Sequence, residues 1–128
     1  MVDTSKCPCG TEKPYDQCCK PLHEGTKVAS TAEELMRSRY TAYVKKLKDY
    51  LLATWHSSQR DSVQDLSFEN GLRWLGLKII STKDGLENDT EGQVEFIASY
   101  SFHGKAAQIP EHSKFIKEDG RWYYCGVI

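Results

Sequence analysis

Apolar residues recur with a helical period in the first half of the chain. Between residues 32 and 47 they stand about one helical turn apart, which is typical of an amphipathic helix: Ala32, Leu35, Met36, Tyr40, Tyr43 and Leu47. Thr31 and Glu34 match the capping box S/T-x-x-E and should begin this helix. Residues 49–55 predict a second, short helix, and residues 61–68 predict a third.

The period changes to two beyond Gly71, which predicts strands. One buried face should carry five alternate residues: Val94, Phe96, Ala98, Tyr100 and Phe102. A similar alternation over residues 74–79 predicts another strand, with Leu75, Leu77 and Ile79 on one face. Asp119-Gly120 stands between two further strand-like segments, Ser113–Glu118 and Arg121–Val127, and predicts a two-residue hairpin turn.

This order of elements, helices first and strands afterwards, predicts an α+β fold. We expect the helices to pack on one face of an antiparallel sheet of about four strands. The segment 21–30 is expected to be a connector that leads into the helices.

The composition indicates a soluble globular protein with room for one domain and a small appendage. The 128 residues are 39% hydrophobic and 27% charged, and 17 Lys and Arg face 18 Asp and Glu. This balance lacks the basic footprint of a nucleic-acid binder, so we do not expect a nucleic-acid partner. The sequence contains no run of about 18 apolar residues, the length that would predict a membrane span. Its N-terminus also lacks the pattern of a secretory signal. We therefore expect a cytoplasmic protein.

Four of the five cysteines fall within thirteen residues, in the pattern C-x-C-x8-C-C. They are Cys7, Cys9, Cys18 and Cys19, and the fifth, Cys125, stands alone near the C-terminus. Two close pairs of thiolates favour a tetrahedral zinc site. Pro8 and Gly10 suit the turn that would bring the first pair together. His23 is a reserve ligand if Cys18 or Cys19 points away.

Two other interpretations of the cysteines remain open at this point. A disulfide is disfavoured in a cytosolic chain, and a bridge between the adjacent Cys18 and Cys19 would form a strained ring. A redox-active thiol pair normally shows C-x-x-C in a thioredoxin-like pattern, which this chain lacks.

The segment CPCGTEKPYDQCC closely resembles the SEC-C motif, C-x-C-x8-C-[HC], the zinc-binding element best known from the tail of the SecA translocation ATPase. Three further segments are similar to the YchJ family of uncharacterised bacterial proteins: residues 29–56, 74–79 and 111–124. The resemblance strengthens the zinc interpretation. It also implies an NTF2-like (cystatin-like) domain, in which the sheet is curved and forms a pocket. We therefore expect a zinc motif with its connector in residues 1–27 and an NTF2-like domain in residues 28–128.

Four thiolates around Zn²⁺ would leave no open coordination position to activate water, so the zinc should be structural. Elsewhere the chain shows no Ser-His-Asp order, nucleophile elbow, phosphate-binding loop or paired carboxylates. The sequence therefore predicts no catalytic residues.

Aromatic and polar residues of the α+β domain are candidates for the lining of a ligand pocket, although alternating aromatics are more often plain core. The candidates are Tyr40, Tyr43, Trp55, His56, Trp74, Tyr100, Ser113 and Trp122. Arg37 and Arg39 border the apolar stripe of the first helix. They could hold an anionic ligand at a pocket mouth or cover the stripe and pair with acids such as Glu111. His56 could act as a general base only with a partner that the sequence does not identify.

Two hypotheses follow for function. The first is a zinc-binding accessory or adaptor protein that docks a protein partner through its SEC-C-like element. The second is a small-ligand-binding protein or an enzyme that uses the cavity of the NTF2-like domain.

Overall fold

The computed structural model describes residues 6–60 and 71–128, with the helices before the strands. The helical elements are η1 (Tyr15–Gln17), α1 (Lys20–His23), α2 (Ala32–Lys45), α3 (Lys48–Ala53) and α4 (Ser57–Arg60). The strands are β1 (Leu72–Asp84), β2 (Glu91–Phe102), β3 (Lys105–Glu118) and β4 (Arg121–Val127). The helix predicted over residues 61–68 lies outside the described residues.

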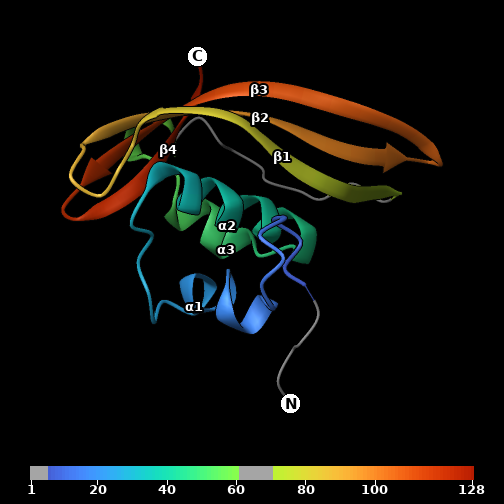
Figure 1. The fold of residues 1–128 in the computed structure, drawn as a ribbon, viewed down its shortest axis with the longest axis horizontal. Helices are drawn as coiled ribbons and strands as arrows, with labels where there is room; N and C mark the ends of the chain where they lie inside the picture. Colours follow the sequence, from blue (N-terminus) through green and yellow to red (C-terminus); the bar gives the residue numbers. More distant parts are fainter. Residues whose placement is uncertain (1–5, 61–70) are drawn as a thin grey trace.

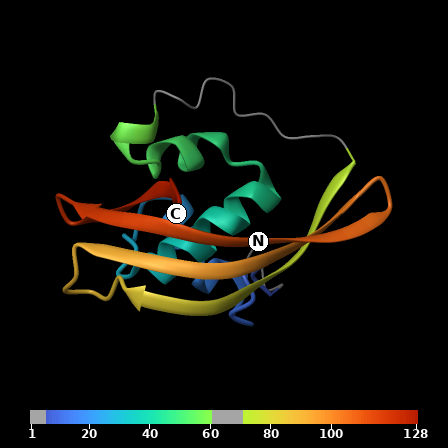
Figure 2. The same cartoon turned by 90° about the horizontal axis from the view of Figure 1, so that it is seen from above.

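The strands form one antiparallel sheet in the order β1-β2-β3-β4, and the sheet curves around α2 and α3 (Figures 1 and 2). The predicted α+β class with four strands is therefore confirmed. The N-terminal residues 6–23, which we call the N-terminal element, lie against α2, mostly on the side away from the sheet (Figure 1), and their turn at Gly10 approaches strand β1. Helix α2 is thus covered on two sides.

The start of α2 follows the predicted capping box with one change. Thr31 Oγ1 accepts a hydrogen bond from the Glu34 backbone N–H at 3.1 Å. The Glu34 carboxylate reaches one residue further back than expected, because it accepts from the Ser30 N–H at 3.3 Å. The two bonds satisfy backbone donors at the helix start and fix where the connector turns into the helix.

The predicted faces of β1 are wrong at its start. Trp74 pairs with Tyr100 but Gly76 pairs with Ser99, so one extra residue, Leu75, is inserted as a bulge. Leu75 is consequently 54% exposed, whereas Trp74 turns towards α2 and meets the Tyr40 ring edge-on at 5.8 Å. A bulge shifts the alternation of inward- and outward-facing side chains by one residue, and a strict period of two in the sequence cannot predict such a shift.

The predicted hairpin at Asp119-Gly120 joins β3 to β4, and both residues have positive φ, 51° and 79°. Positive φ at both central positions is the geometry of the type I′ turn, which matches the twist of the flanking strands. Strand β3 begins at Lys105, eight residues before the predicted Ser113, because its residues 105–116 pair with the whole of β2.

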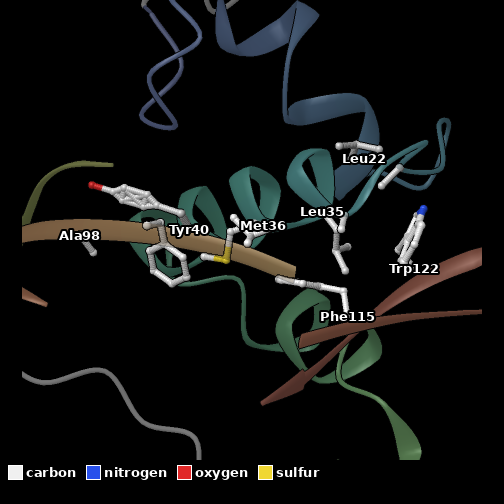
Figure 3. Packing of buried hydrophobic residues seen from close by; sticks show 11 residues of the cluster. Leu22, Leu35, Met36, Tyr40, Ala98, Phe115 and Trp122 are labelled. Carbon is white, nitrogen blue, oxygen red and sulfur yellow. The ribbon is translucent and has the colours of Figure 1, made fainter. Parts of the chain in front are cut away.

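The hydrophobic core lies between α2 and the concave face of the sheet (Figure 3). Val94 of β2 and Phe115 of β3 are fully buried, and they pack with Leu35 and Met36 of α2. Trp122 of β4 closes one end of the core and donates its indole N–H to the Ser30 carbonyl at 3.2 Å. This packing fixes α2 as the scaffold for everything that contacts it.

Candidate functional site

The four clustered cysteines come together in the N-terminal element as predicted. The sulfur atoms of Cys7, Cys9, Cys18 and Cys19 all lie within 4.8 Å of one another. The Sγ atoms of Cys9 and Cys18 are 3.5 Å apart, and those of Cys18 and Cys19 are 3.9 Å apart. Bonds of about 2.3 Å to a tetrahedral Zn²⁺ place sulfurs about 3.8 Å apart. All four are free thiols, and their spacing suits a tetrahedral metal ion better than a disulfide.

Local backbone geometry brings the two pairs of cysteines together. The Gly10 N–H donates to the Cys7 carbonyl at 3.3 Å, and the Cys7 N–H donates to the Lys13 carbonyl at 2.8 Å. Gly10 adopts φ +89°, and a Cβ there would stand 3.2 Å from the Leu77 carbonyl of β1. Only glycine suits this turn, both for its φ and for its close approach to the sheet.

The thiols of the cluster differ strongly in acidity. Hydrogen bonds from Cys19 and Cys7 lower the pKa of Cys9 far below its usual range. Hydrogen bonding with Cys7 and Cys9 raises the pKa of Cys19, and burial raises the pKa of Cys18 to about 11. A thiolate therefore forms more readily at Cys9 than at Cys18 or Cys19. A bound metal dication would supply the positive charge needed to hold all four as thiolates.

Helix α2 and the turn after Cys9 supply groups around the cluster that the sequence analysis did not identify. The Thr41 hydroxyl oxygen lies 3.6 Å from Cys7 Sγ, and the Thr11 hydroxyl oxygen lies 3.0 Å from Cys18 Sγ. Hydroxyl donors of this kind orient thiolate ligands and balance their charge. Nothing in the sequence indicates that the hydroxyl group of either threonine faces a cysteine sulfur.

Arg37 belongs to this site and does not line the cavity described below. Its guanidinium Nη1 donates to the Cys9 carbonyl, and its Nε is 3.0 Å from a Glu33 carboxylate oxygen. The arginine thus connects α2 to the turn between Cys9 and Gly10.

His23 is placed away from the sulfur cluster. Its Nε2 is 2.8 Å from the Ser38 carbonyl of α2, and its Nδ1 is 2.8 Å from the Tyr15 hydroxyl. Since a carbonyl only accepts, Nε2 carries the proton and Nδ1 accepts from Tyr15 in the neutral ring. Burial lowers the pKa of His23 and favours this neutral form. With both nitrogens so used, His23 connects the N-terminal element to α2 and offers no lone pair to a metal at the cluster.

A second feature is a cavity of about 270 Å³ between α2 and the concave face of the sheet. Six residues predicted to line a pocket do line it: Arg39, Tyr40, Tyr43, Trp55, Trp74 and Glu111. The other six residues of the lining were not among the predicted pocket residues: Met36, Leu77, Phe96, Ala98, Ile109 and Tyr124. Four of them, Met36, Leu77, Phe96 and Ala98, stand on the apolar faces predicted for the helix and the strands. The walls are mostly apolar and aromatic, with a few polar groups, as in small-molecule sites.

Besides Arg37, four of the predicted pocket residues lie outside this lining: His56, Tyr100, Ser113 and Trp122. Ser113 is buried behind Glu111 and donates to its carboxylate at 3.0 Å. Tyr100 packs on Trp74 with ring centroids 6.0 Å apart.

His56 has the carboxylate partner that the sequence did not identify, outside the cavity. Its Nε2 lies 2.6 Å from Glu118 Oε2, and its Nδ1 lies 2.6 Å from the Ser58 hydroxyl. Nδ1 also accepts the Ser58 backbone N–H at 3.1 Å, at the start of α4. This arrangement caps the short helix and ties it to β3, which is a structural role.

A protein-family model for the middle NTF2-like domain of YchJ matches residues 31–126. The chain belongs to the YchJ family. A UPF0225 protein of Chromobacterium violaceum is 46% identical over 123 residues, covering 95% of this chain and 91% of that protein. A UPF0225 protein of Streptomyces coelicolor is 46% identical over 124 residues, covering 97% and 95%.

Two solved structures share the fold of this YchJ-family chain. The solution structure of a SEC-C motif containing protein from Rhodopseudomonas palustris has a TM-score of 0.84 and 34% identity, covering 96% of this chain and 97% of that one. The crystal structure of a SEC-C motif containing protein from Psychrobacter arcticus has a TM-score of 0.79 and 27% identity, covering 97% and 82%. The family, the SEC-C motif and the NTF2-like fold inferred from the sequence are thereby confirmed. Among the described helices, none has the length and apolar composition needed to cross a bilayer.

Proposed function

We propose that this YchJ-family protein is a cytoplasmic zinc-binding accessory protein whose N-terminal element docks onto a protein partner. The observation that carries the proposal is the set of four cysteine sulfurs within 4.8 Å of one another. Cys7, Cys9, Cys18 and Cys19 would fill all four positions of a tetrahedral Zn²⁺. No position would remain for water or substrate, so the metal has a structural role.

The composition of the N-terminal element supports a metal that holds it together. Its buried cluster consists of Tyr15 and three of the cysteines, with the fourth, Cys18, packed against them. This is too small a set to form a hydrophobic core, and its helical elements are single turns. In such an element the free energy of metal binding supplies much of the free energy of folding.

The exposed side of the N-terminal element supports docking of a protein. Glu12, Lys13 and Gln17 are exposed, and Glu12 and Lys13 carry opposite charges. A polar groove of about 190 Å³ beside them is lined by Cys18 of the cluster and by Glu33 and Arg37 of α2, among others. Mixed charge suits a protein surface better than a phosphate backbone. Because the element is fixed to α2, this surface is formed before any partner binds.

The test uses the full chain as bait, with a charge reversal on the docking surface. Lys13→Glu changes an exposed charge beside the metal cluster, and Lys114→Glu makes the same change on the exposed part of β3. The proposal predicts a partner that wild type and Lys114→Glu retain, and that both Lys13→Glu and the metal-ligand variant Cys9→Ser lose. A partner that all four proteins capture equally would contradict docking through the N-terminal element.

A further inference from the structure

Arg39 of α2 is a buried cation in the described structure. Its side chain lies in the core-facing part of the helix and the residue is only 2% exposed. Nη1 donates to the Leu51 carbonyl at 2.8 Å and to the Thr54 hydroxyl at 2.6 Å. The guanidinium carbon lies 4.8 Å from the centre of the Trp55 ring and 4.6 Å from that of Tyr124.

All of these partners are neutral. Within residues 6–60 and 71–128, Arg39 makes no ion pair with a carboxylate. Arginine stays charged in proteins, and burial of a charge without a counter-ion is costly. Burial lowers the pKa of Arg39, and tyrosine hydroxyls, Tyr43 first, only partly oppose this. A structural role at the end of α3 would require only a neutral donor, so the retained charge calls for another explanation.

The cavity between α2 and the sheet supplies that explanation, because Arg39 lines it. Most of the remaining wall is apolar or aromatic and includes Tyr40, Trp74 and Phe96. Glu111 lines the same cavity without pairing with Arg39, and its carboxylate is held by the Ser113 hydroxyl at 3.0 Å. The cavity therefore has one cation, one anion and otherwise mainly apolar walls, which suit a ligand with an apolar body and polar ends.

We propose that this cavity binds a small organic carboxylate with an aromatic or alkyl body, whose carboxylate pairs with Arg39. The Glu111 carboxylate accepts a hydrogen bond from a hydroxyl or amine on the same ligand. A planar guanidinium packed against two aromatic rings is preorganised for a carboxylate. At about 270 Å³ the cavity is near the small end of ligand sites, roughly 300–1,000 Å³, so the ligand is of single-ring size. The proposal does not depend on the metal or on a protein partner.

Matched acids and amides test the charge requirement on wild-type protein. The probes are 4-hydroxyphenylacetate and phenylacetate, each compared with its neutral amide, and binding is followed through ¹⁵N-labelled indole groups. The chain has three tryptophans. Trp55 and Trp74 line the cavity, whereas Trp122 lies outside its lining. The proposal predicts that the acids shift the Trp55 and Trp74 signals but leave Trp122 in place. The acids should bind about tenfold or more tightly than their amides, as expected for a charge-assisted hydrogen bond.

Two variants assign the two ends of the ligand. Arg39→Met should bring acid and amide to equal affinity, and Arg39→Lys should retain a preference for the acid. Glu111→Gln should weaken 4-hydroxyphenylacetate but not phenylacetate. Equal affinity of acid and amide for the wild-type protein would overturn the proposal, as would shifts spread over all three indoles or no binding of either acid at millimolar concentration. These comparisons on the wild type remain decisive even if a variant fails to fold.

Discussion

His23 gives a sharp prediction, because it joins the N-terminal element to α2 without contributing to the metal cluster. We consider His23→Phe, which keeps a ring of similar size. The contacts with Tyr50 and Tyr15, at centroid distances of 4.7 Å and 5.7 Å, should then be largely retained. What the substitution removes is the pair of hydrogen bonds to the Tyr15 hydroxyl and the Ser38 carbonyl.

The expected cost follows from these two bonds. Each typical hydrogen bond contributes about 0.5–1.5 kcal/mol to stability, so losing both should lower the free energy of unfolding by about 1–3 kcal/mol. For a chain of this size a loss of about 2 kcal/mol lowers the melting temperature by roughly 6–10 °C. Zinc content should not change, because neither nitrogen of His23 faces the cysteines.

Urea unfolding of the zinc-loaded protein measures the loss, and native mass spectrometry of the same sample measures the metal. Tyr15→Phe is the matched control, because it removes only one of the two bonds and should cost about half as much. The double variant should lose less than the sum of the single losses, since Tyr15 and His23 share a bond. Loss of zinc from His23→Phe would refute the assignment and make His23 a ligand. Unchanged stability would refute its role as a connector.

Three further predictions concern other parts of the molecule. Cys9→Ser should release the metal and make the buried Tyr15 accessible to chymotrypsin while the α+β domain stays intact; equal protection of Tyr15 in wild type and variant would contradict this. Burial raises the pKa of Tyr40 to about 12 from near 10. The stability that comes from keeping the Tyr40 hydroxyl neutral in the folded protein is thus complete below pH 10 and is lost as pH rises towards 12. Between pH 9 and pH 11, the free energy of unfolding in urea should therefore fall less for Tyr40→Phe than for wild type. Phe115→Ala should cost about 3–5 kcal/mol in urea unfolding, against about 0.5 kcal/mol or less for the exposed Leu75→Ala; similar costs would contradict the described core.

Local signals predicted most of the elements and the clustering of the four cysteines. The capping box at Thr31, the Asp119-Gly120 turn and the buried face of β2 from Val94 to Ala98 each depend on neighbouring residues, so they are visible in the sequence. Phe102, predicted on the same buried face, is 36% exposed at the end of the strand. The same holds for the cysteine pairs, since a tight turn brings Cys7 and Cys9 together and a short element returns the chain to Cys18.

Features that depend on distant partners were not predictable in this way. Leu75 was expected on one face with Leu77, but the bulge depends on how β1 pairs with β2. His23 was a plausible ligand by distance along the chain, yet its orientation is set by Ser38 of α2. Arg37 and Arg39 are two residues apart on one helix, and only the packing around α2 sends one to the metal cluster and the other to the cavity.

The central claim, a structural zinc ion held by four cysteines, is tested most directly by native mass spectrometry of tag-free protein purified without chelator. We expect one zinc ion per chain, released on acid denaturation. Cys9→Ser should lose it, and Cys125→Ser, which changes the cysteine outside the cluster, should retain it. A wild-type chain without metal, with its thiols free or oxidised, would contradict the account and assign the cluster to thiol chemistry instead.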